Sequence, residues 1–370
     1  MFNFQNYFRA LFSSIRYFGN KEYDFNLKQF LLKVFLFVFF TIVVIINHVF
    51  FLFDEIFLFF YRFTRIEKPV MIIGVPRTGT TFLYRTIAED KENFTCFTFG
   101  EIVFAPSLIQ KYIYYSIYRF DKFLGGPLKK CLLFLETKTK IEYDKIHAYG
   151  YFKPEEDELM LLNIYSSIVL KYFFPLSTVF DKYIEFDEKV RPAEKRKIFN
   201  FQKRYIKKHL FFWRTIQGKQ KIFLCKNPIH SPKINSLFEY FPDMRFIVTN
   251  RNLAEVIPSF VSMNASAIKN LHTTKLLYPN AVVARKVIMN WQEQLTAKLK
   301  QKNPAQIYEC TYDNLTNDIR EVVCNIYKYF DLQMSDDFLK ILGHKLKEQQ
   351  NYKSNHHYNL TELNKVLGEI

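Results

Sequence analysis

The sequence lacks the cysteine and histidine patterns that hold metal ions or disulfide frameworks. Its five cysteines are scattered, odd in number and never in C-x-x-C spacing, and its eight histidines include no H-E-x-x-H. We therefore expect neither a disulfide framework nor a metal cofactor. The sequence also has no internal repeat and no low-complexity linker, and 49% of its 370 residues are hydrophobic. Such a chain can bury the core of one large domain, with or without appendages.

Acidic residues are fewer than basic ones, 36 against 52, which gives a net charge of +16. This excess indicates an anionic partner, which could be a nucleotide donor, an acidic acceptor, a phospholipid surface or a nucleic acid. The charge alone does not choose among these partners.

Charged residues are absent from Val34 to Phe53, a span of 20 residues that matches a bilayer core. Asn47 and His48 interrupt this run, so a helix lying in the membrane plane competes with a full span, and a buried arm packed on the domain is a third possibility. We predict that residues 1–66 form an N-terminal, membrane-associated helical region. A span would place the rest of the chain across the membrane, whereas the in-plane anchor that we favour leaves it at the cytoplasmic face.

The stretch from Pro69 to Leu83, P-V-M-I-I-G-V-P-R-T-G-T-T-F-L, organises the rest of the chain. Branched apolar residues predict a buried strand, a short loop with two glycines follows, and a helical pattern begins at once. At such a junction the loop amides and the first helical turn point at one spot, where an anion is held. Gly79 lets a ligand oxygen approach the backbone.

This loop lacks the lysine of a nucleotide P-loop. Gly74 and Gly79 fit the first half of G-x-x-x-x-G-K-[ST], but Thr80 stands at the lysine position. Arg77 is the cation inside the loop that could gather charge on a terminal oxyanion. A phosphate-like donor other than magnesium-bound ATP is indicated, and an ordinary strand-turn-helix is the alternative.

Two further strands end at basic residues. One predicted strand ends at Lys226 and the next ends just before Arg251, with a helix capped by Ser231 between them. This β-α-β unit predicts a parallel sheet with a right-handed crossover. Lys226 and Arg251 should then lie along the same sheet edge as Arg77 and line one crevice with it.

A serine follows Arg251 at a suggestive distance. Asn252 and Glu255 have the form of a capping box that begins a helix. Ser259 lies eight residues after Arg251, about two helical turns on, so both side chains could face one ligand.

Two of these motifs resemble the sulfotransferase family. P-R-T-G-T-T-F-L resembles the loop that binds the 5′-phosphosulfate of PAPS (3′-phosphoadenosine 5′-phosphosulfate), and T-N-R-N-L-A-E-V-I-P-S is similar to the segment that holds its 3′-phosphate. Y-D-N-L at 312–315, followed by an amphipathic helix, is similar to the C-terminal part of the family. The resemblance covers about residues 67–360 and departs from the family at Leu253, where proline is usual.

The resemblance implies an α/β fold with a P-loop-like, three-layer core and a central parallel sheet in residues 67–370. A large helical insertion on the acceptor side would occupy about residues 100–220. The implied activity is that of a membrane-associated or bacterial-type sulfotransferase that moves a sulfuryl group from PAPS to a hydroxyl. The aromatic-rich insertion and the membrane segment favour a lipid-linked or amphipathic alcohol, with no nucleic-acid partner.

The resemblance also implies roles for single residues. Arg77 and Lys226 would neutralise charge on the transferring group, and Arg251 and Ser259 would hold the 3′-phosphate. The backbone amides that would cradle the 5′-phosphosulfate are those of Arg77, Thr78, Gly79, Thr80 and Thr81. In the C-terminal tail, Lys353 offers a cation for a lid over the adenine or the 3′-phosphate, although a frayed polar terminus explains it as well.

Three residues compete for the role of general base. The cluster Lys153–Glu158 has acids in a first helical turn after proline, which the helix dipole favours by itself, but Glu156 could also take a hydroxyl proton. His147 lies just upstream. Cytosolic relatives carry a histidine two residues after the lysine, whereas His230 lies four residues after Lys226, and membrane or bacterial branches often use a glutamate.

Two other classes of function stay open at this stage. One is a nucleotide phosphotransferase with a degenerate P-loop, although the strand before Arg251 lacks the acid of a magnesium-binding strand. The other is a non-catalytic membrane adaptor whose basic surface binds anionic lipid.

Overall fold

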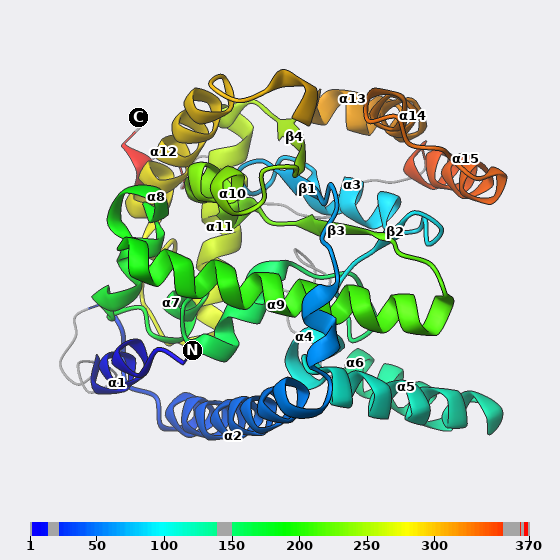
Figure 1. The fold of residues 1–370 in the computed structure, drawn as a ribbon. Helices are drawn as coiled ribbons and strands as arrows, with labels where there is room; N and C mark the ends of the chain where they lie inside the picture. Colours follow the sequence, from blue (N-terminus) through cyan, green and yellow to red (C-terminus); the bar gives the residue numbers. More distant parts are fainter. Residues whose placement is uncertain (1, 14–21, 139–149, 351–362, 364–365, 369–370) are drawn as a thin grey trace.

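A computed structural model of the chain describes residues 2–13, 22–138, 150–350, 363 and 366–368. Its strands form one parallel sheet in the order β2-β3-β1-β4-β5 (Figure 1). The strands are β1 Val70–Ile73, β2 Phe94–Thr95, β3 Ile222–Lys226, β4 Arg245–Asn250 and β5 Ile307–Thr311. The first strand of the chain is thus the central one, with β3 and β4 on either side.

Helices surround this sheet. The α-helices are α1 Phe4–Ser13, α2 Leu27–Phe57, α3 Thr80–Ile87, α4 Phe99–Phe104, α5 Leu108–Phe123, α6 Pro127–Lys138, α7 Leu170–Phe173, α8 Phe186–Lys189, α9 Pro192–Gln217, α10 Ile234–Tyr240, α11 Leu253–Leu271, α12 Ala281–Leu299, α13 Tyr312–Asn317, α14 Ile319–Tyr329 and α15 Asp336–Gln350. The short 3₁₀-helices are η2 Phe59–Phe63, η4 Asp157–Ile164, η5 Thr178–Tyr183, η6 Pro228–Lys233 and η7 Pro304–Gln306.

The sheet separates two apolar cores, as the alternation of strand side chains requires. Val70 and Ile72 of β1 pack with α3, α13, α14 and α15, whereas Met71 and Ile73 pack with η4, α9 and α10. Figure 1 shows the same three layers, with α3, α13 and α14 above the sheet and α9 below it. The predicted α/β fold with a P-loop-like, three-layer core and a central parallel sheet is confirmed.

The strand ends align the predicted site. Ile72 of β1 pairs with Lys226 of β3, and Ile73 pairs with Val248 of β4. Because the strands are parallel, the segments that follow β1, β3 and β4 leave the sheet at the same edge. The expected parallel sheet and the common edge of its strand ends are therefore confirmed.

Two local predictions differ from the structure. Ser231 does not cap a helix: η6 begins earlier, at Pro228, because the Asn227 side chain accepts a hydrogen bond from the Ile229 amide, and Ser231 donates to the Pro228 carbonyl. The acidic cluster after Lys153 begins the 3₁₀-helix η4, with Glu156 as its N-cap residue.

Among the residues that the structure describes, one helix, α2, is long and apolar enough to cross a membrane, judged by length and composition alone. It lies along the base of the molecule, in line with α5 (Figure 1). Near its start, Gln29 accepts a hydrogen bond from Thr273, and near its end Asp54 accepts the amides of Leu108 and Ile109 and pairs with Lys208. One face of α2 is thus attached to the domain over most of its length.

The polar residues that interrupt the apolar run lie on that attached face. Asn47 is 1% exposed, donates to Asn163 and to the Val103 carbonyl, and accepts from Gln110. The opposite face of α2 exposes large apolar side chains along its length, from Leu27 to Phe57. Helix α2 therefore has one attached face and one exposed apolar face, and the count of uncharged residues did not indicate this difference.

Candidate functional site

The loop after β1 owes its shape to two glycines. A Cβ at Gly74 would lie 2.5 Å from the Thr249 carbonyl oxygen, so only glycine lets this loop pass so close to β4. Gly79 has a φ of +86°, and a Cβ there would lie 3.0 Å from the Tyr312 ring. Helix α3 begins immediately after Gly79.

Arg77 also has a left-handed backbone, with a φ of +73°. A non-glycine residue in this conformation stores strain, and such strain concentrates at functional sites. Arg77 and Gly79 flank Thr78, whose buried hydroxyl donates to the Val75 carbonyl at 2.8 Å and lies 2.7 Å from the Thr249 hydroxyl. The Thr78 side chain is occupied within the protein, so this residue could serve a ligand only through its backbone.

Lys226 connects the end of β3 to the start of α3. Its ammonium donates to the Thr81 hydroxyl at 3.2 Å and to Glu156 Oε1 at 2.5 Å. The lysine side chain is 2% exposed, whereas that of Glu156 is 19% exposed. A buried cation and a partly accessible carboxylate therefore lie side by side at the beginning of the loop helix.

A second group forms around Arg251. Arg77 Nε donates to the Ser259 hydroxyl at 3.0 Å, and Arg251 Nη1 donates to the Arg77 carbonyl at 3.2 Å. The Arg251 guanidinium also stacks on the Tyr312 ring, 3.8 Å from its centroid, and pairs with Glu255 at 2.7 Å. Although Pro258 lies inside α11, the next residue, Ser259, still faces the loop.

The structure thus places the three predicted cations around one loop, but in two separate groups. Lys226 contacts Thr81 in the first turn of α3, whereas Arg77 extends toward Ser259 and Arg251. Glu255 does not complete the expected capping box, because its carboxylate is bound to Arg251, while Asn252 alone caps α11.

His230 lies in a different place from Glu156. Its ring is fully buried, with Nε2 3.2 Å from Glu158 Oε2, and Glu158 also pairs with Lys233 at 2.5 Å. Burial alone would raise the pKa of Glu158, but Lys233 and His230 more than offset this and lower it to about 2. This buried cluster fixes η4 against η6. His230 is therefore enclosed by the protein, and only Glu156 of the candidate bases contacts Lys226 in the described chain.

Asp157 also helps to hold η4 in place. It accepts a hydrogen bond from the Asn227 side chain at 3.0 Å, next to Lys226 in sequence. Burial raises the pKa of Asp157, since the favourable charge of His230 and the hydrogen bond from Asn227 compensate for it only in part. Of the other predicted residues, His147 and Lys353 lie outside the described residues.

Sequence reasoning missed two parts of this site. Tyr312, which contacts both the Gly79 position and Arg251, lies in the Y-D-N-L segment and begins the short helix α13. The buried acids Asp157 and Glu158 lie in the cluster that was examined for a base and a helix start. Both segments could be identified in the sequence, but the contacts that their residues make join positions far apart in the chain.

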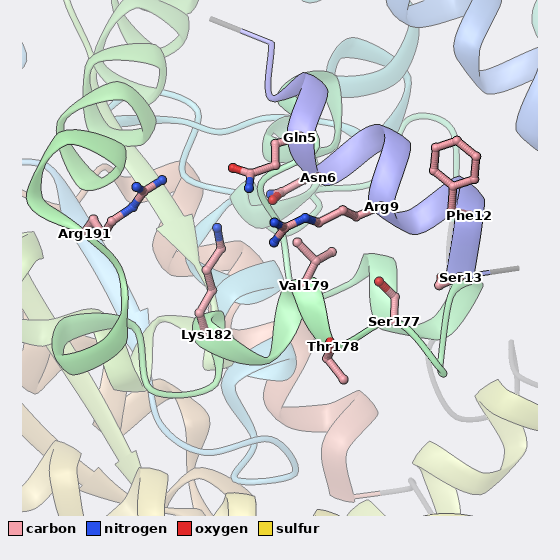
Figure 2. Close-up of a pocket in the computed structure, with 10 residues that line it drawn as sticks. All are labelled: Gln5, Asn6, Arg9, Phe12, Ser13, Ser177, Thr178, Val179, Lys182 and Arg191. Carbon is pink, nitrogen blue, oxygen red and sulfur yellow. The ribbon is translucent and has the colours of Figure 1, made fainter. Parts of the chain in front are cut away.

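Two hollows lie outside this loop. One is an apolar cavity of about 730 Å³ beside α2. The other, of about 620 Å³, is polar, and in it Arg9, Lys182 and Arg191 point toward the same space from α1, η5 and the start of α9 (Figure 2). Phe12 lines both hollows.

Comparison with known proteins gives this geometry a context. A sequence model of the sulfotransferase family matches residues 168–336, which include Lys226, Arg251 and Ser259. The omega-hydroxy-beta-dihydromenaquinone-9 sulfotransferase Stf3 of Mycobacterium tuberculosis is 25% identical over 313 residues, which cover 82% of this chain and 73% of the relative. The same holds for Stf3 of Mycobacterium bovis. These matches support a place for the chain among the bacterial-type sulfotransferases.

Solved sulfotransferase structures agree with this chain in fold. Sulfotransferase STF1 of Mycobacterium tuberculosis H37Rv superposes with a TM-score of 0.64 at 17% identity, over 99% of this chain and 92% of STF1. Sulfotransferase STF9 of Mycobacterium avium gives a TM-score of 0.64 at 16% identity, over 86% of this chain and 80% of STF9. At these identities the likeness concerns the fold alone.

Proposed function

We propose that this chain is a sulfotransferase that uses PAPS as donor and transfers the sulfuryl group to a hydroxyl of a lipid-linked or amphipathic acceptor. One observation carries the donor assignment: Arg77, Lys226 and Arg251 gather around a single loop, in two groups that are joined through that loop. The donor carries one anionic group at the 3′ position of its ribose and another at the 5′ position, and two separate cationic groups suit such a molecule.

The chemistry of the loop residues fits the two ends of the donor. Lys226, the first-turn amides of α3 and the left-handed backbone at Gly79 would hold the 5′-phosphosulfate, since helix starts and such loops bind anions. Arg251 and Ser259 would hold the 3′-phosphate, and the position of Arg77 beside Ser259 suggests that it serves this end as well. That Arg77 also neutralises the transferring group stays a prediction.

Glu156 is our choice for the general base. The donor supplies an activated sulfuryl group; in the transfer a bond forms between the acceptor oxygen and sulfur, and the bond from sulfur to the 5′-phosphate oxygen breaks. Glu156 would take the hydroxyl proton, and Lys226 would stabilise the charge that develops on the departing phosphate oxygen. Their contact at 2.5 Å keeps the two groups together before substrates bind.

The acceptor assignment rests on two separate observations. The relative Stf3 is named for an omega-hydroxy dihydromenaquinone, which is a lipid with a hydroxyl group. In this chain the apolar outer face of α2 offers a way to reach such a lipid. A lipid-linked or amphipathic alcohol is consistent with both.

We further propose that α2 lies in the plane of one leaflet and does not span the membrane. Its contacts with the domain at Gln29 and Asp54 are about 37 Å apart at 1.5 Å per residue. This exceeds the hydrocarbon core of about 30 Å, so a spanning α2 would pull the domain into the bilayer. Residues 1–66 would then be a membrane-associated region of a sulfotransferase domain at 67–370, on the cytoplasmic face.

Ligand binding and transfer test the donor assignment. We expect 3′,5′-diphosphoadenosine to raise the thermal unfolding temperature and magnesium-bound ATP to have no such effect. Arg77→Ala and Lys226→Ala should abolish transfer from labelled PAPS while the folded protein remains, and Lys219→Ala, at an exposed lysine, should retain full activity. Full activity in either of the first two variants would refute their assignment, and a response to ATP alone would favour a phosphotransferase.

A further inference from the structure

The apolar cavity beside α2 is a second site that the donor loop does not use. It has a volume of about 730 Å³ and lies between the attached face of α2, α4, η4 and α7. Phe37 and Phe40 of α2 form one wall, Val103 lies on α4, and Leu162 and Phe174 face them from the other side. Its size falls within the range of roughly 300–1,000 Å³ that is usual for small-molecule sites.

The chemistry of the wall specifies the kind of occupant. Aromatic and aliphatic side chains make up most of it, and the polar residues collect at one end, near the start of α2. Two of these, Gln29 and Lys33, already contact Thr273 and His272. Water in an apolar cavity lacks hydrogen-bond partners, so such a site favours a hydrocarbon chain over a polar ligand.

The cavity is joined to the candidate base through one short helix. Leu159 and Leu162 of η4 line the cavity, and Glu156 is the N-cap residue of the same helix. The Leu159 amide donates to the Glu156 carbonyl at 3.3 Å, so the two residues lie within one turn. Phe99, another wall residue, donates its amide to Lys153 in the segment that leads to Glu156.

The cavity also borders the surface that we assign to the membrane. Its outer wall is α2, and the other face of this helix exposes side chains such as Phe35, Ile42 and Leu52. A hydrocarbon chain could therefore move from a leaflet into the cavity without crossing water. The polar hollow beyond Phe12, with its three cations, does not suit such a chain (Figure 2).

We propose that this cavity binds the apolar chain of the acceptor and thereby presents a hydroxyl at the end of that chain to Glu156 and Lys226. This inference rests on the proposed function for the identity of the ligand. The expected acceptor is a long, apolar chain with a terminal primary hydroxyl. Chain length, and not only the presence of a hydroxyl, should then decide how well an alcohol is used.

A substitution that fills the cavity with a larger side chain tests this inference. Val103→Trp places an indole in the wall, and Val283→Trp is the matched control, because Val283 on α12 is 55% exposed. Transfer from labelled PAPS would be measured with 1-hexadecanol and with 1-butanol. We expect Val103→Trp to lower kcat/KM for hexadecanol by at least about tenfold, the usual scale for altered apolar pockets, and to leave butanol unchanged. Val283→Trp should resemble the unaltered protein with both alcohols.

Direct binding separates failure of this inference from failure of the proposed function. A fluorescent long-chain fatty alcohol should bind the unaltered protein, be displaced by hexadecanol, and bind Val103→Trp at least about tenfold more weakly. Equal losses for both alcohols, or unchanged probe binding, would overturn the cavity assignment. Probe binding without any transfer from PAPS would refute the proposed function and leave the cavity as a lipid-chain site. Should Val103→Trp fail to fold, Val169→Phe fills the same cavity from the loop before α7 and carries the same expectations.

Discussion

At the carboxyl edge of the sheet, directional contacts fix each side chain: Arg77 to Ser259, Arg251 to the Arg77 carbonyl, and Lys226 to both Thr81 and Glu156. Between α2 and η4, by contrast, mostly aromatic and aliphatic side chains line a cavity of about 730 Å³. Under the proposed function, the first region would recognise fixed charges at fixed positions, and the second would accept an apolar chain.

This difference suggests how the two substrates are treated. Hydrogen bonds depend on distance and angle, so the loop side tolerates few changes in the residues or in the donor. Apolar contacts are non-directional and scale with buried area, so many side chains could line the cavity equally well. We therefore expect donor binding to be sensitive to conservative changes and acceptor use to respond to volume.

After the loss of transfer expected for Arg77→Ala and Lys226→Ala, the next largest effect is expected at Glu156, where we propose that the two regions meet. Glu156→Gln keeps the size of the side chain but removes the carboxylate that would take the hydroxyl proton. General-base catalysis typically contributes about 10²–10⁴-fold, so transfer from labelled PAPS should fall within that range. Binding of 3′,5′-diphosphoadenosine, measured by calorimetry, should change little, because the donor is assigned to the loop.

Glu185→Gln is the matched control, since Glu185 has a 37% exposed side chain and pairs with Lys189. It should leave both transfer and binding unchanged. Transfer by Glu156→Gln within about twofold of the unaltered protein, far below the contribution of a base, would mean that another group takes the proton. His147 would then be the first alternative to test, since His230 is enclosed.

The same contrast explains what could be predicted from the sequence. The loop side was predictable because its residues lie within short motifs at strand ends, and parallel strands bring those ends together. Arg77, Lys226 and Arg251 were found in this way, and the structure brings them to one loop.

Other features depend on contacts that no short motif contains. The burial of His230 against Glu158 and the stacking of Tyr312 on Arg251 join segments that are far apart in the chain. The helix after β3 was predicted to begin with Ser231 as its cap, whereas η6 begins earlier, because the Asn227 side chain accepts a hydrogen bond from the Ile229 amide. The cavity could not be predicted from the sequence. A helix that packs one face on the domain and a helix that is apolar all round can contain the same number of uncharged residues, so the count did not indicate which face of α2 is attached.

A medium effect is expected from the backbone of the loop. Gly79→Ala and Gly218→Ala both place a Cβ on a left-handed residue, at φ values of +86° and +71°. That conformation alone costs roughly 1–2 kcal/mol, so both variants should lower the free energy of unfolding by about that amount in urea denaturation. The two positions differ in their surroundings: nothing lies within 4 Å of a Cβ at Gly218, whereas Tyr312 would lie 3.0 Å from one at Gly79.

Gly79→Ala should therefore destabilise the protein more than Gly218→Ala does. It should also weaken the binding of 3′,5′-diphosphoadenosine, because the displaced Tyr312 ring carries the Arg251 guanidinium. We expect roughly a fivefold increase in Kd, which corresponds to about 1 kcal/mol, and no change for Gly218→Ala. Equal binding by the two variants would show that the loop tolerates this shift and that the Tyr312 contact is not part of donor recognition.

The smallest effect on transfer is expected on the α2 side, at His272. This residue is 1% exposed, its Nε2 lies 2.7 Å from the Tyr172 carbonyl, and its Nδ1 lies 3.4 Å from the Lys33 ammonium of α2. Burial lowers the pKa of His272 to about 4; the hydrogen bond to the Tyr172 carbonyl offsets part of this effect, and the charge of Lys33 adds a smaller lowering. An unfolded histidine has a pKa of about 6.5, so the unfolded chain binds the proton more readily.

The direction of the pH dependence follows from the lower pKa of His272 in the folded protein. The contribution of His272 to stability is fully present above about pH 6.5 and is lost as the pH falls from there toward 4. It amounts to no more than about 3.5 kcal/mol, since the two pKa values differ by about 2.5 units and one pKa unit corresponds to about 1.4 kcal/mol. His272→Gln should flatten the decline of the free energy of unfolding in this window and leave transfer at pH 7.5 unchanged, whereas His344→Gln, at an exposed histidine of α15, should keep the decline. A loss of transfer in His272→Gln would mean that the attachment of α2 also positions the acceptor, so that the two regions are coupled and the contrast between them is weaker than the contacts suggest.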